Sequence, residues 1–394
     1  MGLTQFKYLR LRRILAFMVV LTLSSMLSSL TALSLLSFYK GLSAYMGEGE
    51  NVIIVYDMGS RTPFTGLVPA FLADKIMAVD SVLACSPEVI APCIVKGEPI
   101  FLRGVLPEEF LKINGISIID GEKLSPKELN YAMIGIRASE KTGLKAGDKV
   151  LVTGVLSQTC LELHIKGVFA SGSPLDDEII APLHVGQWLR GAGYNHVTII
   201  RVKVHDINVQ EEVLSVISKA STEPSREGGQ TQPSGQGSFE QAPVRWLPIR
   251  FRAEDIGVEG AERFLIDYME RYGVTRETII VLSAATLIFS GSVILLSTQA
   301  LISQHSREIR ILRFIGASRK ILVRDLTLKI APISLLASAL GTTLAASLLG
   351  YILESGLLQI LSHSIQIYLD TYTIILITLS ILAITLLGIR TATK

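Results

Sequence analysis

The 394-residue sequence lacks the short motifs that usually reveal an enzyme. It contains no G-x-x-x-x-G-K-[ST], H-E-x-x-H or G-x-S-x-G. Their absence argues against a P-loop nucleotide site, a zinc protease helix and a hydrolase nucleophile elbow. The six histidines show no ligand spacing, and the three cysteines fit no zinc pattern. The sequence therefore predicts neither a catalytic centre nor a metal or cofactor bound by this chain.

Charge is missing from four stretches, residues 14–39, 278–304, 330–353 and 371–389. An apolar helix of about 20 residues crosses the hydrocarbon core of a bilayer, and each stretch is close to that length or longer. The first is longer than the hydrophobic region of a cleaved signal peptide. We therefore predict four transmembrane helices. The alternative, buried helices of a soluble fold, would require four unusually long apolar helices in one chain.

Lys and Arg are concentrated in the short segments between these stretches. Residues 1–13, 305–329 and 390–394 contain four, seven and two of them, whereas residues 354–370 contain none. Short cytoplasmic segments of membrane proteins are rich in Lys and Arg. We therefore predict that both termini and residues 305–329 are cytoplasmic and that 354–370 is a short outer loop. Residues 1–13 are predicted to form an amphipathic helix on the lipid bilayer, with a frayed basic tail as the alternative.

The large outer segment, residues 40–277, contains 24 Lys or Arg and 31 Asp or Glu, a net charge of −7. This acidity argues against nucleic acid as a partner. Strand-like and helix-like runs alternate, so we predict an α+β extracytoplasmic domain. Residues 219–243 are predicted to be a flexible low-complexity insertion, and 258–277 a helical stalk before the second span. The strand-like runs are 51–56, 100–104, 131–136, 149–154, 160–169 and 196–204.

Two polar features of the outer segment allow structural interpretations. Cys85 and Cys93 are close enough in sequence for a local disulfide in an oxidising compartment, which would leave Cys160 unpaired. Buried free thiols are an equally good alternative. The acidic turn S-P-L-D-D at 173–177 is predicted to be a solvated turn rather than a catalytic or cation site.

The spans themselves carry information about packing. Small residues recur in the third span at Ala337, Gly341, Ala345 and Gly350, a pattern that favours close contact with another helix. None of the four stretches contains an acidic or basic side chain, which argues against a proton relay or an ion-coupled transporter.

The basic segment 305–329 contains the string R-E-I-R-I-L-R-F-I-G-A-S-R-K at 307–320. On a helix this string has an apolar stripe and a cationic stripe. Gly316 is predicted to end the helix and Ser318 to start the next one. Such a helix would either rest on the lipid surface or enter a groove on a cytoplasmic partner. The apolar stripe, the expected groove anchors, is Ile309, Leu312 and Ile315; the cationic stripe is Arg307, Arg310 and Arg313.

The same string resembles the R-E-I-x-x-L-R-x-x-G-A-S-[RK] signature of ABC transporter permeases of the FtsX/MacB type, which follows the second span there as it does here. Phe314 departs from the pattern, since a small residue is common at its position. The resemblance implies a permease subunit, working as a homodimer, that binds a separate cytoplasmic P-loop ABC ATPase. The residues expected to couple the two are Arg307, Glu308, Ile309, Arg310, Leu312, Arg313, Ile315, Gly316 and Ala317.

The resemblance also implies a function, ATP-driven export or mechanotransmission to the extracytoplasmic domain, which could act on an extracytoplasmic partner protein. ATP and Mg²⁺ would be bound by the ATPase, so this chain would not itself be an enzyme. The alternative is a signalling or scaffold protein of the membrane whose outer domain senses a ligand, including FtsX-like control of an extracytoplasmic hydrolase.

Overall fold

The computed structural model divides the chain into two compact units. The helical unit comprises Met1–Leu42, Met269–Ile360 and Ser364–Lys394, and the sheet unit comprises Ser43–Tyr268 and Leu361–His363. The structure describes residues 11–44, 51–60, 62, 64–206, 209–222, 251–271, 275–354, 359–360, 363–364 and 368–393. Residues 1–10 of the predicted amphipathic helix and 223–243 of the predicted insertion lie outside these ranges.

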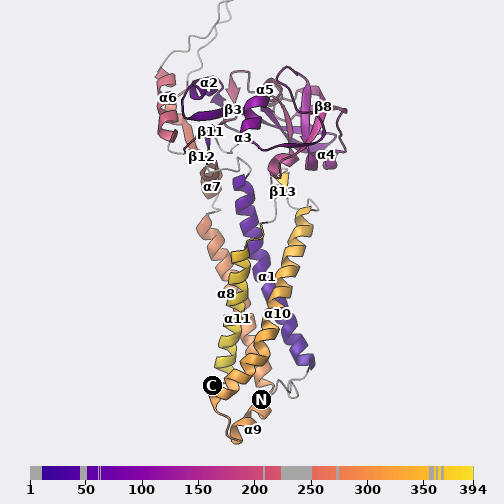
Figure 1. Ribbon diagram of the computed structural model, residues 1–394, viewed down its shortest axis with the longest axis vertical. Helices are drawn as coiled ribbons and strands as arrows, with labels where there is room; N and C mark the ends of the chain where they lie inside the picture. The colour runs from indigo at the N-terminus through magenta and orange to yellow at the C-terminus, as the bar shows by residue number, and fades with distance from the viewer. Residues whose placement is uncertain are drawn as a thin grey trace, which may run out of the picture. The chain divides into compact units, whose positions relative to one another are not determined.

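Four long helices of the helical unit are apolar enough to cross a membrane (Figure 1). The prediction of four transmembrane helices is confirmed. The candidate spans are Arg12–Phe38, Glu277–Ser303, Arg319–Leu353 and Thr371–Ala392. They belong to α1 (Leu11–Ala44), α8 (Arg276–Ser303), α10 (Arg319–Glu354) and α11 (Thr371–Ala392), and the short helix α9 (Ser306–Phe314) lies between α8 and α10 in sequence.

Helix α10 begins at Arg319, although the uncharged stretch that predicted it begins only at residue 330. Leu322, Leu326 and Ile330 are all buried in the core of the helical unit. Because they are four residues apart, they form one apolar face that extends the span into the basic segment. The basic residues from Arg319 to Lys329 therefore belong to the same helix as the third span, which agrees with the predicted helix start at Ser318.

Helices α1 and α10 contact each other through small and hydroxyl residues. A Cβ atom on Gly341 would lie 2.5 Å from the carbonyl oxygen of Thr22, so the two backbones touch at this glycine. The Ser25 hydroxyl donates to the carbonyl oxygen of Ser338 at 3.0 Å, and the hydroxyls of Ser29 and Thr342 are 3.1 Å apart. Small residues and interhelical hydrogen bonds are the usual means of helix packing in lipid. Of the small residues predicted to pack, Ala337, Gly341, Ala345 and Gly350 are all buried.

The sheet unit contains a ten-stranded mixed sheet of order β12-β1-β11-β3-β4-β9-β6-β8-β5, with β7 pairing with both β3 and β8 (Figure 1). Its strands are β1 (Val52–Asp57), β3 (Val82–Val95), β4 (Glu98–Val105), β5 (Ser117–Gly121), β6 (Tyr131–Gly135), β7 (Lys149–Gly154), β8 (Cys160–Ala170), β9 (Ile179–Pro182), β11 (Ile199–Val204) and β12 (Ile256–Gly260). The helices are α2 (Leu72–Met77), α3 (Pro107–Ile113), α4 (Ile136–Thr142), α5 (Leu183–Arg190), α6 (Gln210–Thr222) and α7 (Ala261–Arg271). An α+β domain between the first and second spans is confirmed.

Four further short strands are present among the described residues. Strands β2 (Val68–Pro69) and β10 (His196–Val197) pair with each other. Strands β13 (Gln359–Ile360) and β14 (His363–Ser364) lie between α10 and α11 in the sequence.

The 14-residue strand β3 joins two halves of the sheet. Its first half pairs with β11, where Glu88 lies opposite Ile199, and its second half pairs with β4 from Val89 to Val95. One apolar core forms around β1, β11, α2 and α6, and a second around β4, β6, β7 and β8. The central strand therefore brings residues of both halves side by side.

The structure corrects the predicted disulfide. Cys85 and Cys93 are both free and buried, and both lie on β3. Eight residues of extended strand span about 26 Å, so the two sulfur atoms cannot bond. Burial raises the pKa of each thiol to about 12, which keeps both protonated. The alternative of buried free thiols is the correct one.

Two predicted boundaries also change. The first three residues of the predicted stalk, 258–260, belong to strand β12, which pairs with β1 so that Ile53 lies opposite Gly260. The helical part of the predicted stalk starts only at Ala261, the first residue of α7. Residues 219–222 of the predicted insertion are the last turn of α6, whose apolar residues Val213, Ile217 and Ala220 pack into the core at helical spacing.

Candidate functional site

The basic segment forms a helix, a sharp turn and a second helix, as its sequence predicts. Helix α9 ends at a glycine, Gly316, whose φ of +99° is in the left-handed region. The amide of Gly316 donates to the carbonyl oxygen of Arg313 and the amide of Ala317 to that of Leu312, each at 3.0 Å. This pair of bonds is a Schellman motif, which satisfies carbonyls that the end of the helix leaves open. The direction of the turn is thereby set by the backbone.

The exposed apolar surface of this helix differs from the predicted stripe. Ile309 packs against the core of the helical unit, so it is not a free groove anchor. Ile309 lies one helical turn after His305, whose side chain is only 2% exposed. Residues four positions apart share one face of a helix, so both side chains face the core of the helical unit. The exposed apolar residues are instead Ile311, Leu312, Phe314 and Ile315, which we call the apolar tip.

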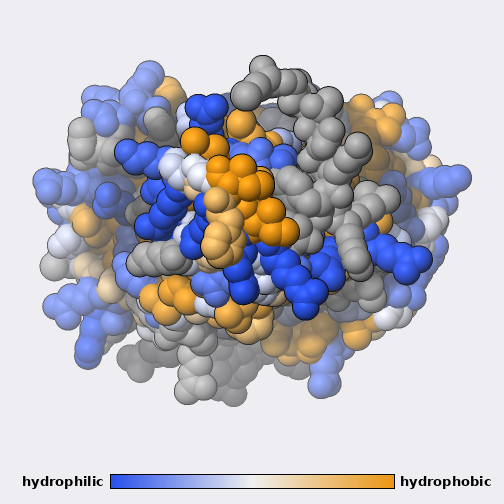
Figure 2. Space-filling view, turned by 90° about the horizontal axis from the view of Figure 1, so that it is seen from below, coloured by the Kyte–Doolittle hydropathy of each residue, from blue (hydrophilic) through white to orange (hydrophobic). Residues whose placement is uncertain are grey.

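The two residues at the end of the apolar tip are highly exposed. Phe314 is 85% exposed and Ile315 is 78% exposed. Figure 2, seen from the end at which α9 lies in Figure 1, shows apolar residues gathered in a patch with hydrophilic residues around it. The arginines Arg307 and Arg310 are exposed as well. The site thus combines an apolar patch with nearby cations, which is the composition the sequence predicts, but with Ile311 and Phe314 in place of Ile309.

Two other arginines of the segment bind the end of α11. Arg313 Nη2 donates to the carbonyl oxygen of Thr393 at 2.7 Å, and Arg319 Nη2 donates to that of Arg390 at 3.2 Å. The last carbonyls of a helix have no partner within the helix, and they form the negative end of its dipole. A guanidinium group can donate hydrogen bonds to these carbonyls, and its positive charge is attracted to the negative end of the dipole. Arg313 therefore positions the turn within the chain, and it is also exposed, so its predicted contact with a partner stays a prediction.

Helices α1, α8 and α11 are joined at this end in a similar way. Arg13 Nη1 donates to the carbonyl oxygen of Gln304 at 3.1 Å, and the Gln299 amide donates to the Thr391 hydroxyl at 3.1 Å. The turn after α9 is thus held on a framework of hydrogen-bonded helix ends. The side chain of Glu308, another residue predicted to contact the ATPase, is outside the described part of the structure.

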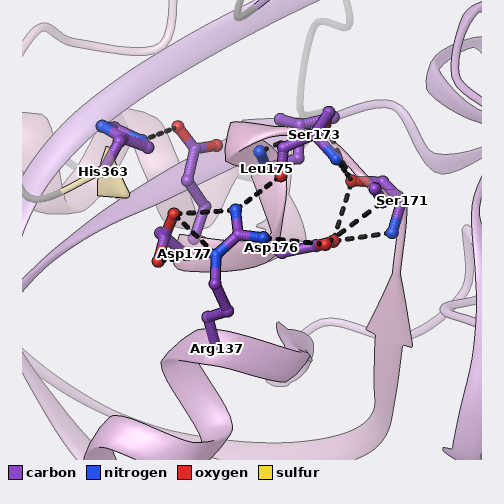
Figure 3. Close-up of polar contacts among 9 residues, drawn as sticks. Arg137, Ser171, Ser173, Leu175, Asp176, Asp177 and His363 are labelled. Carbon is purple, nitrogen blue, oxygen red and sulfur yellow. Dashed lines mark hydrogen bonds and ion pairs between the residues drawn. The ribbon is translucent and has the colours of Figure 1, made fainter. Parts of the chain in front are cut away.

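The acidic turn of the sheet unit is buried, contrary to the prediction of a solvated turn. Asp176 is 3% exposed and Asp177 is 8% exposed. Arg137 reaches both carboxylates, with Nη2 2.9 Å from Asp177 Oδ2 and Nη1 3.3 Å from Asp176 Oδ2 (Figure 3). Asp176 also accepts from the amide and hydroxyl of Ser171. Arg137 and backbone amides satisfy these acids, so their role is structural. Across the described residues no group of His, Cys, Asp and Glu side chains could hold a metal ion.

Sequence reasoning missed a buried set of charges in the same unit. Arg103 lies between two carboxylates, with Nη1 2.7 Å from Glu88 and Nε 2.6 Å from Glu178. Glu88 also accepts from Arg201 at 2.7 Å, and all four side chains are 0% exposed. A charged residue inside an otherwise apolar strand is the signal that could have revealed them. We call Arg201, Glu88, Arg103 and Glu178 the charge ladder.

Comparison with known proteins identifies the part of the chain that contains α9. Residues 280–393 match the family described as FtsX-like permease C-terminal. This segment is similar to the C-terminal domain of FtsX-like permeases, and we call it the permease domain. The permease domain includes the whole of α9, α10 and α11, so the resemblance of the basic segment to FtsX/MacB-type permeases is confirmed. The match supports an ABC-type permease, a class that implies a cytoplasmic ATPase partner, and together with the four spans indicates a multi-pass protein of the cell membrane.

Similarity outside the permease domain is low. None of the curated proteins compared with this chain matches it. The periplasmic region of MacB from Actinobacillus actinomycetemcomitans is 11% identical, with a TM-score of 0.38, covering 57% of this chain and 96% of that one. The extracellular domain of the noncanonic ABC-type transporter YknZ from Gram-positive bacteria is 15% identical, with a TM-score of 0.33, covering 41% and 88%. At this level neither structure says what the sheet unit binds.

Proposed function

We propose that this chain is the membrane subunit of an ATP-driven ABC system. A separate cytoplasmic ATPase binds the apolar tip and changes the conformation of an extracytoplasmic sheet unit. The observation that carries the proposal is the exposure of Phe314 and Ile315, at 85% and 78%, beside the exposed Arg307 and Arg310. Apolar side chains at the end of a short helix, bordered by cations, suit a groove with an acidic rim.

The geometry of the turn supports a role in transmitting force. The Schellman motif at Gly316 holds the apolar tip in one orientation before any partner binds, which lowers the entropy lost on binding. Helix α10 continues without a break from Arg319 into the third span. Arg313 and Arg319 tie the turn to the end of α11. Displacement of the apolar tip would therefore move two spans together.

The remaining parts of the proposal follow from the permease class. ATP and Mg²⁺ are held by the partner ATPase, and hydrolysis takes place there. The permease works as a homodimer with its termini and α9 in the cytoplasm, and the sheet unit acts on a substrate or a partner protein outside the membrane. The clustering of Lys and Arg in residues 1–13, 305–329 and 390–394 supports this orientation.

The test is co-purification from native membranes in mild detergent. Tagged wild-type chain is compared with the double variant Phe314→Asp, Ile315→Asp and with the control Leu156→Asp, which changes a 56% exposed leucine of the sheet unit. We expect a P-loop ATPase with the wild type and the control, and at least tenfold less with the double variant.

Equal recovery of the ATPase with all three chains would contradict the proposed site, and would favour a helix that only rests on the lipid surface. Absence of an ATPase from every sample, with the chains intact, would favour the signalling or scaffold function.

A further inference from the structure

The charge ladder follows the order of the strands that carry it. Arg201 is on β11, Glu88 on β3 and Arg103 on β4, and Glu178 directly precedes β9. Positive and negative side chains therefore alternate across four neighbouring positions of the sheet, β11-β3-β4-β9. Each contact between neighbours is 2.6 to 2.7 Å. Buried charges are stable only when they are paired in this way.

A fifth side chain, His363, completes the charge ladder. Its Nε2 lies 2.9 Å from Glu178 Oε1, and its side chain is 9% exposed (Figure 3). A carboxylate only accepts hydrogen bonds, so Nε2 carries the proton in this contact. The imidazole also stacks on the ring of Phe101, with centroids 5.3 Å apart and planes at 19°. A charge-assisted hydrogen bond and an aromatic contact thus help to hold the ring.

His363 does not come from the part of the chain that forms the ten-stranded sheet; it begins the short strand β14. It lies in the sequence between α10, which ends at Glu354, and α11, which begins at Thr371. Nevertheless it belongs to the sheet unit, whereas residues on both sides of it in sequence belong to the helical unit. The chain passes between the units near residues 42 and 268 as well. The chain therefore passes from one unit to the other at four points, and two of these lie on either side of residues 361–363.

The hydrogen bond from His363 is energetically important for Glu178. Burial alone would raise the pKa of this carboxyl, but the Arg103 guanidinium and the hydrogen bond from His363 outweigh burial and lower the pKa to about 2. Arg103 already donates to both carboxylate oxygens, at 2.6 and 3.0 Å. Loss of His363 would leave Oε1 with one partner fewer in a site without solvent, where a missing partner is costly.

We propose that His363 is the anchor that holds the segment between α10 and α11 in the sheet unit. The anchor is a property of the chain itself, so it holds whether or not an ATPase binds the apolar tip.

Amide hydrogen exchange of the full chain in nanodiscs tests the anchor. His363→Ala is compared with the wild type, with His363→Gln, whose side-chain amide can still donate to Glu178, and with His205→Ala, which removes an exposed histidine of the same unit. In His363→Ala we expect about tenfold faster exchange in peptides covering 178–182 and 359–364, as the loss of a hydrogen bond to a charged group predicts. The glutamine variant should recover most of the protection.

Peptides covering β1 and β11 report whether the sheet is still folded. Unchanged exchange at 178–182 and 359–364 in His363→Ala would overturn the inference, as would equal loss of protection in the glutamine variant with β1 and β11 intact. If His363→Ala does not fold, exchange at 178–182 and 359–364 is compared between the wild type, His363→Gln and Phe101→Leu. The leucine variant removes the stacking on His363 and also the ring contact with Phe64, but it keeps the hydrogen bond to Glu178. We expect His363→Ala to recover as much ATPase as the wild type does. A failure of the exchange experiment would therefore count against the anchor alone, and a failure of co-purification would count against the apolar tip alone.

Discussion

Arginine has opposite roles in the two units of this chain. In the sheet unit, Arg103 and Arg201 are fully buried and pair with carboxylates. In the permease domain, Arg307 and Arg310 are exposed, and Arg313 and Arg319 are exposed as well but also donate to backbone carbonyls at the end of α11. The difference shows that the surroundings decide what a guanidinium does. A buried one requires a countercharge, an exposed one is available to a partner, and one at a helix end stabilises the dipole.

The largest effect should come from removing a countercharge inside the charge ladder. Glu88→Gln leaves Arg103 and Arg201 beside each other without the carboxylate between them, so we expect a loss of about 3–5 kcal/mol in unfolding free energy. For a unit of this size the melting temperature should fall by roughly 10 °C. Thermal unfolding of the purified chain measures it. Arg310→Ala, which removes an exposed charge, is the control, and a similar loss in both variants would contradict the comparison.

Acid should weaken the charge ladder, whereas the exposed arginines stay protonated at any lower pH. Since the pKa of Glu178 is lowered from 4.5 to about 2, its contribution to stability is present above about pH 4.5 and is lost as the pH falls towards 2. The full contribution is about 3 kcal/mol, from a shift of about two and a half pKa units. Unfolding followed between about pH 5 and pH 3 should show this slope in the wild type and a flatter one in Glu178→Gln. The same slope in both chains would assign the acid sensitivity to other carboxyls.

A smaller effect is expected at the turn that orients the exposed arginines. No atom lies within 4 Å of a Cβ placed on Gly316, so Gly316→Ala costs only the left-handed backbone, about 1–2 kcal/mol. Amide exchange in a peptide covering 312–318 should rise about tenfold. Gly115→Ala provides the control, because Gly115 also has open space around it but no positive φ. If amide exchange at 312–318 is the same in Gly316→Ala as in the wild type, a residue other than Gly316 sets the direction of the turn.

The smallest effect separates arginines of the same segment. Arg313→Ala removes the bond to the carbonyl oxygen of Thr393, so the last turn of α11 should fray and exchange about threefold faster at residues 388–393. Arg310→Ala should leave that peptide unchanged and should instead reduce recovery of the ATPase. Equal exchange in the two variants would show that Arg313 does not position the helix end.

The strands of the sheet unit show which elements the local sequence pattern predicts and which it does not. The runs predicted at 100–104, 131–136 and 149–154 correspond to β4, β6 and β7. The longest strand, β3, was missed. It contains Pro87, Pro92 and the buried Glu88, three residues that usually argue against a central strand. They are accommodated because β3 changes pairing partners along its length and because Arg103 and Arg201 neutralise the carboxylate.

The amino-acid sequence by itself determined the four spans, the basic segment after the second of them and the stop at Gly316. These depend on local properties, namely the length of uncharged stretches and the need for a left-handed residue at a helix end. Only the tertiary structure decided that Ile309 faces inward while Phe314 faces outward, and that Arg313 binds α11. It likewise decided that His363 meets Glu178, 185 positions away in the sequence. Contacts over such separations depend on how strands and helices pack, and no spacing along the chain contains that information.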